Sequence, residues 1–396
     1  MTATAALDLN PFADAFLEDP YPYHEVLRNA GAVVWLPSIG AYGMARYAEV
    51  KAVLTDHVTF CSSRGVGLSD FAKETPVRPA SLLLETDPPI HDRTRGLMNR
   101  IVSLSALRAR RPVWQALADS LIDELVKKRR FDGVSELSEA FPMQAFPETI
   151  GLRTNGREHL LTYGTSVFNA FGPRNAIFEE SHRVAQEASQ WVGESCRRAN
   201  LVPGGWGMAV FEAADRGECT EAEAERLVRS FLSAGVDTTV NGIAHMLLAF
   251  GTHPEAWQQV RDHRPLARSV FDESLRWDST VQTFFRTTTR DVTLDSVLIP
   301  EGSKVLLFLA AANRDPRYWE RPERFDPARK NAGHVGFGFG LHQCLGQMVA
   351  RQEAEIVLNS MLDRISSIRI AGPVTRRLNN TLHALKSLPI EVTPLQ

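Results

Sequence analysis

The stretch FGFGLHQCLG, residues 337–346, places one cysteine among three glycines and a histidine. Glycine adopts positive φ easily and lets the backbone approach a ligand closely, so Gly338, Gly340 and Gly346 indicate a loop wrapped around Cys344. Nearby N–H donors, which such a loop supplies, stabilise a thiolate. A helical pattern resumes at residues 346–358, so the sulfur lies near a helix N-terminus, where a thiol has a lowered pKa. The stretch therefore predicts a thiolate at Cys344 within a loop that approaches a ligand.

The other cysteines show no comparable surroundings. Cys61, Cys196 and Cys219 are far apart and form no CxxC pair, so they indicate neither a zinc site nor a disulfide framework. Lone cysteines of this kind are usually small buried hydrophobes. This usage is simplest in a reducing cytoplasm, which is the expected location.

The chain has 396 residues, of which 44% are hydrophobic, and a formal net charge of −3. It can bury a substantial core, and its charge gives no reason to expect nucleic acid as a partner. No repeat or linker divides it, so we expect one domain over 1–396. The N-terminus has no positive flank followed by an apolar run, and the longest apolar run, Val305 to Ala312, is far short of the ~20 residues that span a bilayer. A soluble protein without membrane contact is expected.

Most of the chain reads as helix, for example Ser105–Lys128 and Arg157–Phe171. Strand signals are few: residues 33–46 resemble a hairpin with its turn at 37–40, and Lys304–Leu309 is a second candidate. Residues 313–340 are rich in Pro, Asp, Arg and Gly, which indicates an ordered but irregular segment. The predicted class is mainly α with small β-sheets.

A central helix is predicted between two clear boundary signals. Thr220 and Glu223 form a capping box, and Gly251 with Pro254 forms a stop signal. About 30 residues lie between them, or roughly 45 Å of helix. From residue 230 to 254 the only formal charge is Asp237, so this part of the helix should be buried.

This helix carries a stripe of polar and small residues on one face, at helical spacing: Ser230, Ser233, Ala234, Asp237, Thr238 and Asn241. Polar groups on a buried helix need polar surroundings, so the stripe as a whole favours a cavity. The alternative for each single hydroxyl is a bond back to a carbonyl of its own helix.

The cysteine loop resembles the haem-binding loop of the cytochrome P450 family in the pattern Phe337-Gly338-x-Gly340-x-His342-x-Cys344-x-Gly346. Other segments occur in the family's order: HDRTR with His91 and Arg95, AGVDTT (234–239), ESLR with Glu273 and Arg276, FFRTTTR with Arg286, and PERFDPAR with Arg324. The resemblance covers essentially the whole chain. It implies the family's fold, a triangular prism around a buried haem with a long central helix.

The resemblance also implies residue roles. Cys344 would be the axial thiolate ligand of haem b, iron protoporphyrin IX, and Phe337, Gly338 and Gly346 would shape its loop. The haem propionates need cationic or donor partners, and the matching positions are His91, Arg95, Arg286 and His342. Glu273, Arg276 and Arg324 would form a buried ion network that holds the fold. Asp237 and Thr238 match the acid–alcohol pair that relays protons when O2 is the co-substrate, with a helix-bonded Thr and an Arg-paired Asp as the alternative.

The residues around the expected pocket suggest a planar aromatic acid. Arg78, Ser81, Arg229, Ser230 and Ser233 offer two cations and three hydroxyls for a carboxylate, although Arg78 can instead pair with Glu85. The walls would be aromatic and narrow, formed by Leu84, Phe168, Phe171, Ala234, Val281 and Phe284.

These segments are similar to those of bacterial P450s that oxidise para-substituted benzoates such as 4-methoxybenzoate. The similarity implies insertion of one oxygen atom from O2 and O-demethylation to 4-hydroxybenzoate and formaldehyde. Residues 173–198 depart from that pattern, with Ser189 where a longer amide is expected, so the para substituent stays open. The alternatives are a methoxyphenol or terpenoid substrate, or a haem-thiolate sensor without turnover, which would need no proton relay.

The chain contains no flavin or iron–sulfur motif, so electrons should come from a separate ferredoxin and an NAD(P)H-dependent ferredoxin reductase. Arg100, Arg108, Arg110 and Arg111 form a candidate basic patch for an acidic ferredoxin, with a merely solvated face as the alternative. We expect a monomer.

Overall fold

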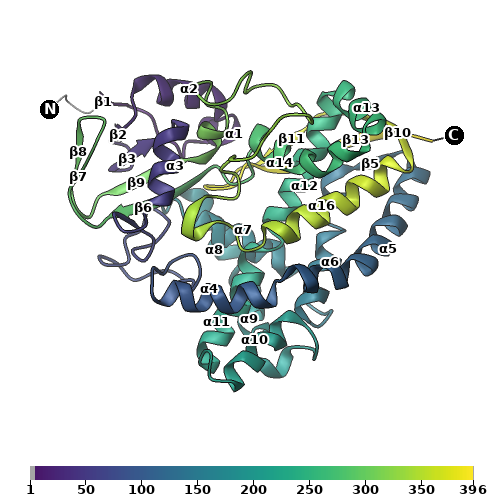
Figure 1. The fold of residues 1–396 in the computed structure, drawn as a ribbon, viewed down its shortest axis with the longest axis horizontal. Coiled ribbons are helices and arrows are strands. Elements are labelled where there is room, and N and C mark those ends of the chain that lie inside the picture. Colours follow the sequence, from purple (N-terminus) through teal and green to yellow (C-terminus); the bar gives the residue numbers. More distant parts are fainter. Residues whose placement is uncertain (1–4, 396) are drawn as a thin grey trace.

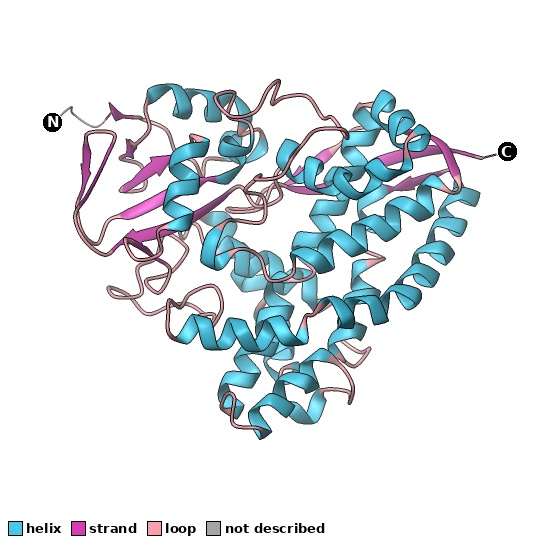
Figure 2. Cartoon of the chain, in the orientation of Figure 1, coloured by secondary structure: helices cyan, strands magenta, loops and turns pink. Residues whose placement is uncertain are grey.

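A computed structural model describes residues 5–395 of the chain. Helices dominate it (Figure 2). The α-helices are α1 (Asp14–Glu18), α2 (Tyr21–Ala30), α3 (Tyr47–Thr55), α4 (Ile90–Ile101), α5 (Leu104–Lys128), α6 (Pro142–Ile150), α7 (His159–Asn169), α8 (Ala176–Val184), α9 (Gln186–Ser195), α10 (Trp206–Asp215), α11 (Glu221–Ala234), α12 (Asp237–Thr252), α13 (Pro254–Asp262), α14 (Ala267–Trp277), α15 (Leu309–Asn313) and α16 (Gln347–Leu362). A π-helix, η1 (Gly133–Ser138), and three 3-10 helices, η2 (Arg198–Asn200), η3 (Arg264–Leu266) and η4 (Gly340–His342), complete the helical elements described.

The strands form small sheets. They are β1 (Ala5–Ala6), β2 (Val34–Leu36), β3 (Ala41–Met44), β4 (Phe60–Cys61), β5 (Arg130–Asp132), β6 (Thr283–Thr288), β7 (Val292–Leu294), β8 (Val297–Ile299), β9 (Lys304–Phe308), β10 (Ile365–Ile370), β11 (Thr375–Arg377), β12 (Ala384–Ser387) and β13 (Pro389–Pro394). The largest sheet has the order β1-β2-β3-β9-β6-β4, and a three-stranded sheet has the order β10-β13-β5. The pairs β11-β12 and β7-β8 are separate hairpins.

The molecule has a broadly triangular outline in this view, with the largest sheet at one upper corner, the sheet of β5, β10 and β13 toward the other, and helices between and below them (Figure 1). Helix α12 is buried along almost its whole length, as its lack of charge predicts. Helix α16, which follows the cysteine loop directly, packs against α5 and α14. The cysteine loop is therefore anchored at its C-terminal end by α16, and its short helix η4 contacts α3.

The local predictions are largely confirmed. The hairpin of β2 and β3 turns at residues 37–40, and β9 begins at Lys304. Helix α5 begins and ends within one residue of the predicted bounds, while α7 is two residues shorter at each end. Residues 314–339 form the expected irregular segment.

The predicted single central helix is wrong, because the structure divides it into α11 and α12. The capping box of Thr220 and Glu223 is present at the start of α11, and α12 ends next to Pro254. The break falls at Gly235 and Val236, inside AGVDTT. A Cβ at Gly235 would lie 2.1 Å from the Phe146 ring, so glycine allows this close contact and also weakens the helix.

A buried ion network ties α14 to the irregular segment. Glu273 and Arg276 form a bidentate pair with both distances 2.8 Å, and neither side chain is exposed. The predicted third member, Arg324, is wrong: it contributes only its backbone carbonyl, and Arg329 reaches Glu273 Oε1 at 3.0 Å instead. The chain turns at 326–329, which brings the guanidinium of Arg329 to Glu273.

Within the described residues, no helix has both the length and the apolar character needed to cross a membrane.

Candidate active site

The cysteine loop is built by tight backbone turns. Gly338 and Gly340 have φ of +69° and +70°, the region that favours glycine. A Cβ at Gly340 would lie only 2.6 Å from the carbonyl oxygen of Leu54. The Cys344 N–H donates to the Phe337 carbonyl at 2.8 Å, which closes the loop. These features explain Gly338 and Gly340, whereas Gly346 has φ of −81° and does not need the conformational freedom of glycine.

The predicted low pKa of the Cys344 thiol is wrong for the protein alone. Burial raises this pKa, and it outweighs the lowering by the N–H groups of Gly346 and Gln347 and by Arg95 and Arg351. The side chain nevertheless has accessible surface. A residue that is enclosed by protein and yet accessible borders an internal space, which is where a group bound to the sulfur would lie.

Two of the predicted propionate cations are enclosed without acidic partners. Burial lowers the pKa of Arg286 to about 10, while Asp87 and Cys61 raise it. Among residues 5–395, its side chain donates one hydrogen bond, to the Phe285 carbonyl at 2.8 Å. Arg95 donates to Asn99 at 3.3 Å and has no carboxylate within 4 Å among residues 5–395. A buried guanidinium without an anion is costly, so buried Arg286 suits a carboxylate of a bound molecule, and half-buried Arg95 is available to another.

The two predicted histidines meet in the same region. The His91 and His342 rings lie 4.5 Å apart between centroids, edge to face. Nε2 of each ring is buried and makes no hydrogen bond, although His342 Nε2 lies 3.5 Å from Asp87 Oδ1. Unpartnered buried nitrogens normally have an unseen partner. Together with Arg95, Arg286 and the accessible sulfur of Cys344, they fit a haem whose propionates supply that partner.

The acid–alcohol pair is present, but its two members are not bonded to each other. Asp237 is buried and accepts from Thr165 at 3.1 Å, Asn241 at 2.9 Å and Arg377 at 3.2 Å. Burial raises its pKa, although Arg377 and the two hydrogen bonds lower it. Thr238 Oγ1 donates to the Ala234 carbonyl at 2.7 Å. This arrangement, an Asp paired with a distant Arg and a Thr bonded to its own helix, is the alternative that the sequence left open. The sequence could not identify the arginine as Arg377, because β11 lies 140 residues from Asp237.

The predicted aromatic wall is assembled. Phe171 lies between Phe168 and Phe284, with ring centroids 5.7 and 5.5 Å apart, and both contacts are edge to face. Ala234 is exposed, and Ser230, Ser233 and Thr238 on the same face are half-buried, so this face of the broken helix opens onto a space. Leu84 and Val281 are half-buried and pack against the same core.

The serine hydroxyls predicted to bind a carboxylate also lie near one another, but two of them donate hydrogen bonds to carbonyls of their own helix. The Ser81 and Ser230 oxygens lie 3.5 Å apart, across a gap of 149 residues in sequence. Ser230 donates to the Arg226 carbonyl at 3.1 Å and Ser233 to the Ser230 carbonyl at 3.3 Å, as the alternative for single hydroxyls states. Ser230 and Ser233 are both half-buried, so their hydroxyls remain accessible for hydrogen bonds with a bound molecule at this end of the pocket.

The cations at this end differ from the prediction. Arg78 is not free: it forms a bidentate pair with buried Glu85, both distances 2.9 Å, and its guanidinium lies 5.0 Å from the Phe171 ring centre. Arg229 has no carboxylate within 4 Å among the described residues. Arg226, which sequence reasoning missed, donates to the Ala80 carbonyl at 2.6 Å and keeps its buried Nε unpartnered. Its position four residues before Ser230 was the available signal.

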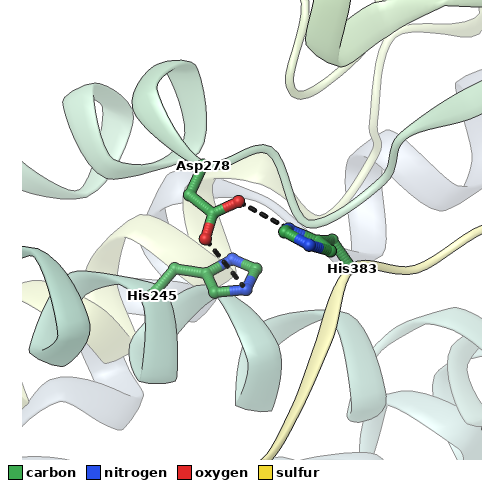
Figure 3. A group of neighbouring side chains, drawn as sticks. All are labelled: His245, Asp278 and His383. Atoms are coloured by element: carbon green, nitrogen blue, oxygen red, sulfur yellow. Dashed lines mark hydrogen bonds and ion pairs between the residues drawn. The ribbon is translucent and has the colours of Figure 1, made fainter. Parts of the chain in front are cut away.

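A second polar cluster consists of His245, Asp278 and His383 (Figure 3). Asp278 binds His383 Nδ1 at 2.7 Å and lies 3.8 Å from His245 Nε2. The same carboxylate accepts from Tyr21 at 2.6 Å and from Arg376 at 3.0 Å. With its acceptor sites filled and a guanidinium beside it, this carboxylate does not suit a metal ion. The cluster instead anchors residues 278–284 to α12.

Known proteins agree with this geometry. A family model described as Cytochrome P450 matches residues 207–392. Cytochrome p450 CYP199A2 of Rhodopseudomonas palustris is 51% identical over 389 residues, which cover 98% of this chain and 94% of that protein. Beta-dihydromenaquinone-9 omega-hydroxylase of Mycobacterium tuberculosis is 31% identical and matches over 98% of this chain and 79% of its own length.

Solved structures agree as well. Cytochrome P450 CYP109Q5 from Chondromyces apiculatus superposes with a TM-score of 0.82 at 28% identity, covering 99% of both chains. P450BioI, solved in complex with an acyl carrier protein that carries hexadec-9Z-enoic acid, superposes with a TM-score of 0.83 at 26% identity, covering 96% of this chain and 100% of its own.

The fold and the thiolate loop define a haem-thiolate protein, and this chain belongs to the cytochrome P450 family. It is therefore a P450 monooxygenase, an oxidoreductase with haem as cofactor, a cysteine thiolate as axial ligand and O2 as co-substrate. Bacterial members take electrons from redox partner proteins and act on small substrates.

Proposed function

We propose that this P450 oxidises para-substituted benzoic acids, with O-demethylation of 4-methoxybenzoate to 4-hydroxybenzoate and formaldehyde as its reaction. The observation that carries the proposal is the meeting of Ser81 and Ser230 at 3.5 Å beside a wall of three phenylalanine rings. An anion-accepting end joined to a flat apolar wall matches a planar aromatic acid. The 51% identity to cytochrome p450 CYP199A2 supports placing this chain in the branch of the family that oxidises para-substituted benzoates.

The carboxylate would be held by the hydroxyls of Ser81, Ser230 and Ser233, with Arg229 as the main counter-charge. Arg226 adds positive charge on the same helix, whereas Arg78 is neutralised by Glu85 and supports the wall through Phe171. A carboxylate bound at one end would direct the para substituent away from the hydroxyls, toward the haem that Cys344 would hold. Leu84, Ala234, Val281 and Phe284 would enclose the ring.

Bound haem would supply oxygen activation, and its holders would be Cys344 with His91, Arg95, Arg286 and His342. The net reaction consumes O2, two electrons and two protons, and it releases one water. Hydroxylation of the methoxy carbon gives a hemiacetal that breaks its C–O bond to release formaldehyde. This chain's own contribution is to orient the acid, exclude water with the phenylalanine wall and deliver protons through Asp237 and Thr238.

The deciding measurement is a titration of the purified ferric protein with 4-methoxybenzoate, followed by haem absorbance, beside its methyl ester. We expect a strong shift to high spin with the acid and little with the ester, because only the acid fills the hydroxyl end. Ser230→Ala should weaken acid binding about tenfold, since one charge-assisted hydrogen bond is lost. Equal shifts with acid and ester, or no shift with either, would remove the benzoate assignment and favour a neutral substrate such as a methoxyphenol or terpenoid.

The proton relay makes a separate prediction. Thr238→Ala should bind 4-methoxybenzoate normally but lower formaldehyde formation about 10²-fold, the usual contribution of a positioned proton donor. NADH oxidation should fall less, with hydrogen peroxide accounting for the difference. The matched control is Thr239→Ala, the next residue, whose hydroxyl donates to the Gly235 carbonyl at 3.2 Å. Full coupling in Thr238→Ala would show that Thr238 is only a helix-bonded hydroxyl.

We propose a ferredoxin, reduced by an NAD(P)H-dependent ferredoxin reductase, as the electron donor. The predicted basic patch is smaller than its sequence suggests, because Arg100 pairs with Glu218 and Arg111 pairs with Glu355 at 3.0 Å. Arg108 and Arg110 have no carboxylate within 4 Å among the described residues and remain available to an acidic partner.

A further inference from the structure

We propose that three asparagines hold the aromatic wall of the pocket in one position and thereby determine which acids the enzyme accepts. We call Asn169, Asn175 and Asn380 the asparagine latch. The proposal rests on the proposed function for the identity of the substrate class. It assigns the latch residues a positioning role, because they act through Phe168 and Phe171.

The centre of the latch joins the end of α7 to the turn between β11 and β12. The Asn380 N–H donates to Asn169 Oδ1 at 2.9 Å, and Asn380 Nδ2 donates to the Asn169 carbonyl at 3.0 Å. Both residues are almost completely buried, at 1% and 2% exposure. Paired bonds between buried amides are costly to break, since each freed group would lie unsatisfied.

Asn175 adds the third connection. Its Nδ2 donates to Asn380 Oδ1 at 2.9 Å, and its Oδ1 accepts from Asn380 Nδ2 at 3.1 Å. The same Oδ1 caps α8 by accepting from the Phe178 N–H at 3.1 Å. The segment between α7 and α8 is therefore fixed at both ends to one asparagine of the β11–β12 turn.

The neighbours of the latch connect it to both walls of the pocket. Thr381 Oγ1 donates to the Phe168 carbonyl at 2.8 Å, and the Thr381 carbonyl accepts from the Gln282 N–H at 2.9 Å. Val281 forms an isolated bridge with Leu382. One turn thus sets the distance between the phenylalanine end of α7 and the strand that carries Val281 and Phe284.

Close backbone packing leaves α7 no room to move away. A Cβ at Gly172 would lie 2.5 Å from Asn380 Cβ, and one at Gly67 would lie 2.7 Å from the Phe171 Cα. The Leu68 N–H also donates to the Phe171 carbonyl at 2.9 Å. The backbone of Phe171 is fixed from two sides, and its ring is packed between Phe168 and Phe284 with Arg78 beside it, so the ring has little room to shift for a wider substrate.

A rigid slot discriminates by width. We expect the wild-type enzyme to bind 4-methoxybenzoate about 100-fold more tightly than 3,4,5-trimethoxybenzoate, because each added group that does not fit costs roughly tenfold or more. Asn380→Ala should lower this ratio to about tenfold, and Asn169→Ala, which removes a single acceptor, should have an intermediate effect.

The experiment measures both dissociation constants by haem absorbance for the wild type and the two variants, after the carbonyl spectrum has shown an intact thiolate site. Asn331→Ala is the matched control, because it removes one amide bond, to the Ser269 carbonyl at 2.9 Å, outside the latch. The latch predicts an unchanged ratio in that control. If Asn380→Ala does not take up haem, the ratio of dissociation constants measured for the milder variant Asn169→Ala decides whether the latch sets the pocket width.

A second probe separates this proposal from the proposed function. Imidazole and 4-phenylimidazole bind haem iron without using an anion site, so their affinity ratio reports pocket width alone. A change in this ratio of about tenfold in Asn380→Ala or Asn169→Ala, with none in Asn331→Ala, supports the latch even if no benzoate binds. Ratios equal to wild type in both latch variants would overturn the latch, whatever the titration with 4-methoxybenzoate shows.

Discussion

Cys344→Ser abolishes the thiolate-specific carbonyl band of the reduced protein and all monooxygenase activity: this is the largest effect that we expect from a single substitution. Serine keeps the size of the side chain but does not ionise near neutral pH, so it cannot provide the electron-rich sulfur ligand of a P450. The loop itself should survive, because its turns depend on Gly338, Gly340 and the bond from the Cys344 N–H to Phe337. The carbonyl difference spectrum measures the outcome directly.

Cys219→Ser is the matched control for this experiment. Cys219 is buried just before α11, and its side chain makes no hydrogen bond or ion pair with residues 5–395. The Cys219→Ser variant should therefore keep the thiolate-specific carbonyl band and the monooxygenase activity. If Cys344→Ser retained that band, the axial ligand would have to be another residue.

The second large effect is expected at the ion network of α14. Glu273→Gln should destabilise the fold by about 3–5 kcal/mol, because it leaves the fully buried Arg276 guanidinium without its carboxylate. Arg276 also donates to the carbonyls of Asn313 at 3.1 Å and Pro322 at 2.7 Å, and Asn313 binds the Val335 N–H just before the cysteine loop. Haem content of the purified protein should therefore fall together with its stability toward urea.

The control is the same substitution in a surface pair. Glu355 on α16 meets Arg111 at 3.0 Å with both side chains partly exposed, and Glu355→Gln should cost no more than about 1 kcal/mol. Equal stability losses in the two variants would show that the buried network has no special role. If Glu273→Gln kept its full haem content, the ion network would not be needed to hold the cysteine loop in place.

Features that depend on neighbouring residues in sequence were predictable. Two of the three glycines around Cys344, Gly338 and Gly340, have the positive φ that the pattern indicates, whereas Gly346 has φ of −81°. The capping box predicts where α11 begins. The uncharged stretch after Ser230 predicts a buried helix, and α12 is one. The resemblance to the P450 family brought together residues that lie more than 200 positions apart, such as His91 and His342, which local patterns alone cannot do.

Predictions about the partners of charged groups were less successful. Arg324 was expected to complete the network, but Arg329 does so. Arg78 was expected at the substrate, but Glu85 neutralises it. The central helix was expected to be continuous, but close packing of Gly235 against Phe146 interrupts it.

The sequence by itself determined the helical class and the tight turns at Gly338 and Gly340, because these follow from residue type and short spacing. The haem-holding cations were indicated by the resemblance to the P450 family and not by spacing. Only the tertiary structure decided which carboxylate each guanidinium meets and which hydroxyls turn back to their own helix. The physical reason is that an ion pair or a buried hydrogen bond forms with whichever partner folding brings within about 3 Å. The asparagine latch is of the same kind, since Asn380 lies more than 200 residues from Asn169 and Asn175 in the chain and meets them only in the folded protein.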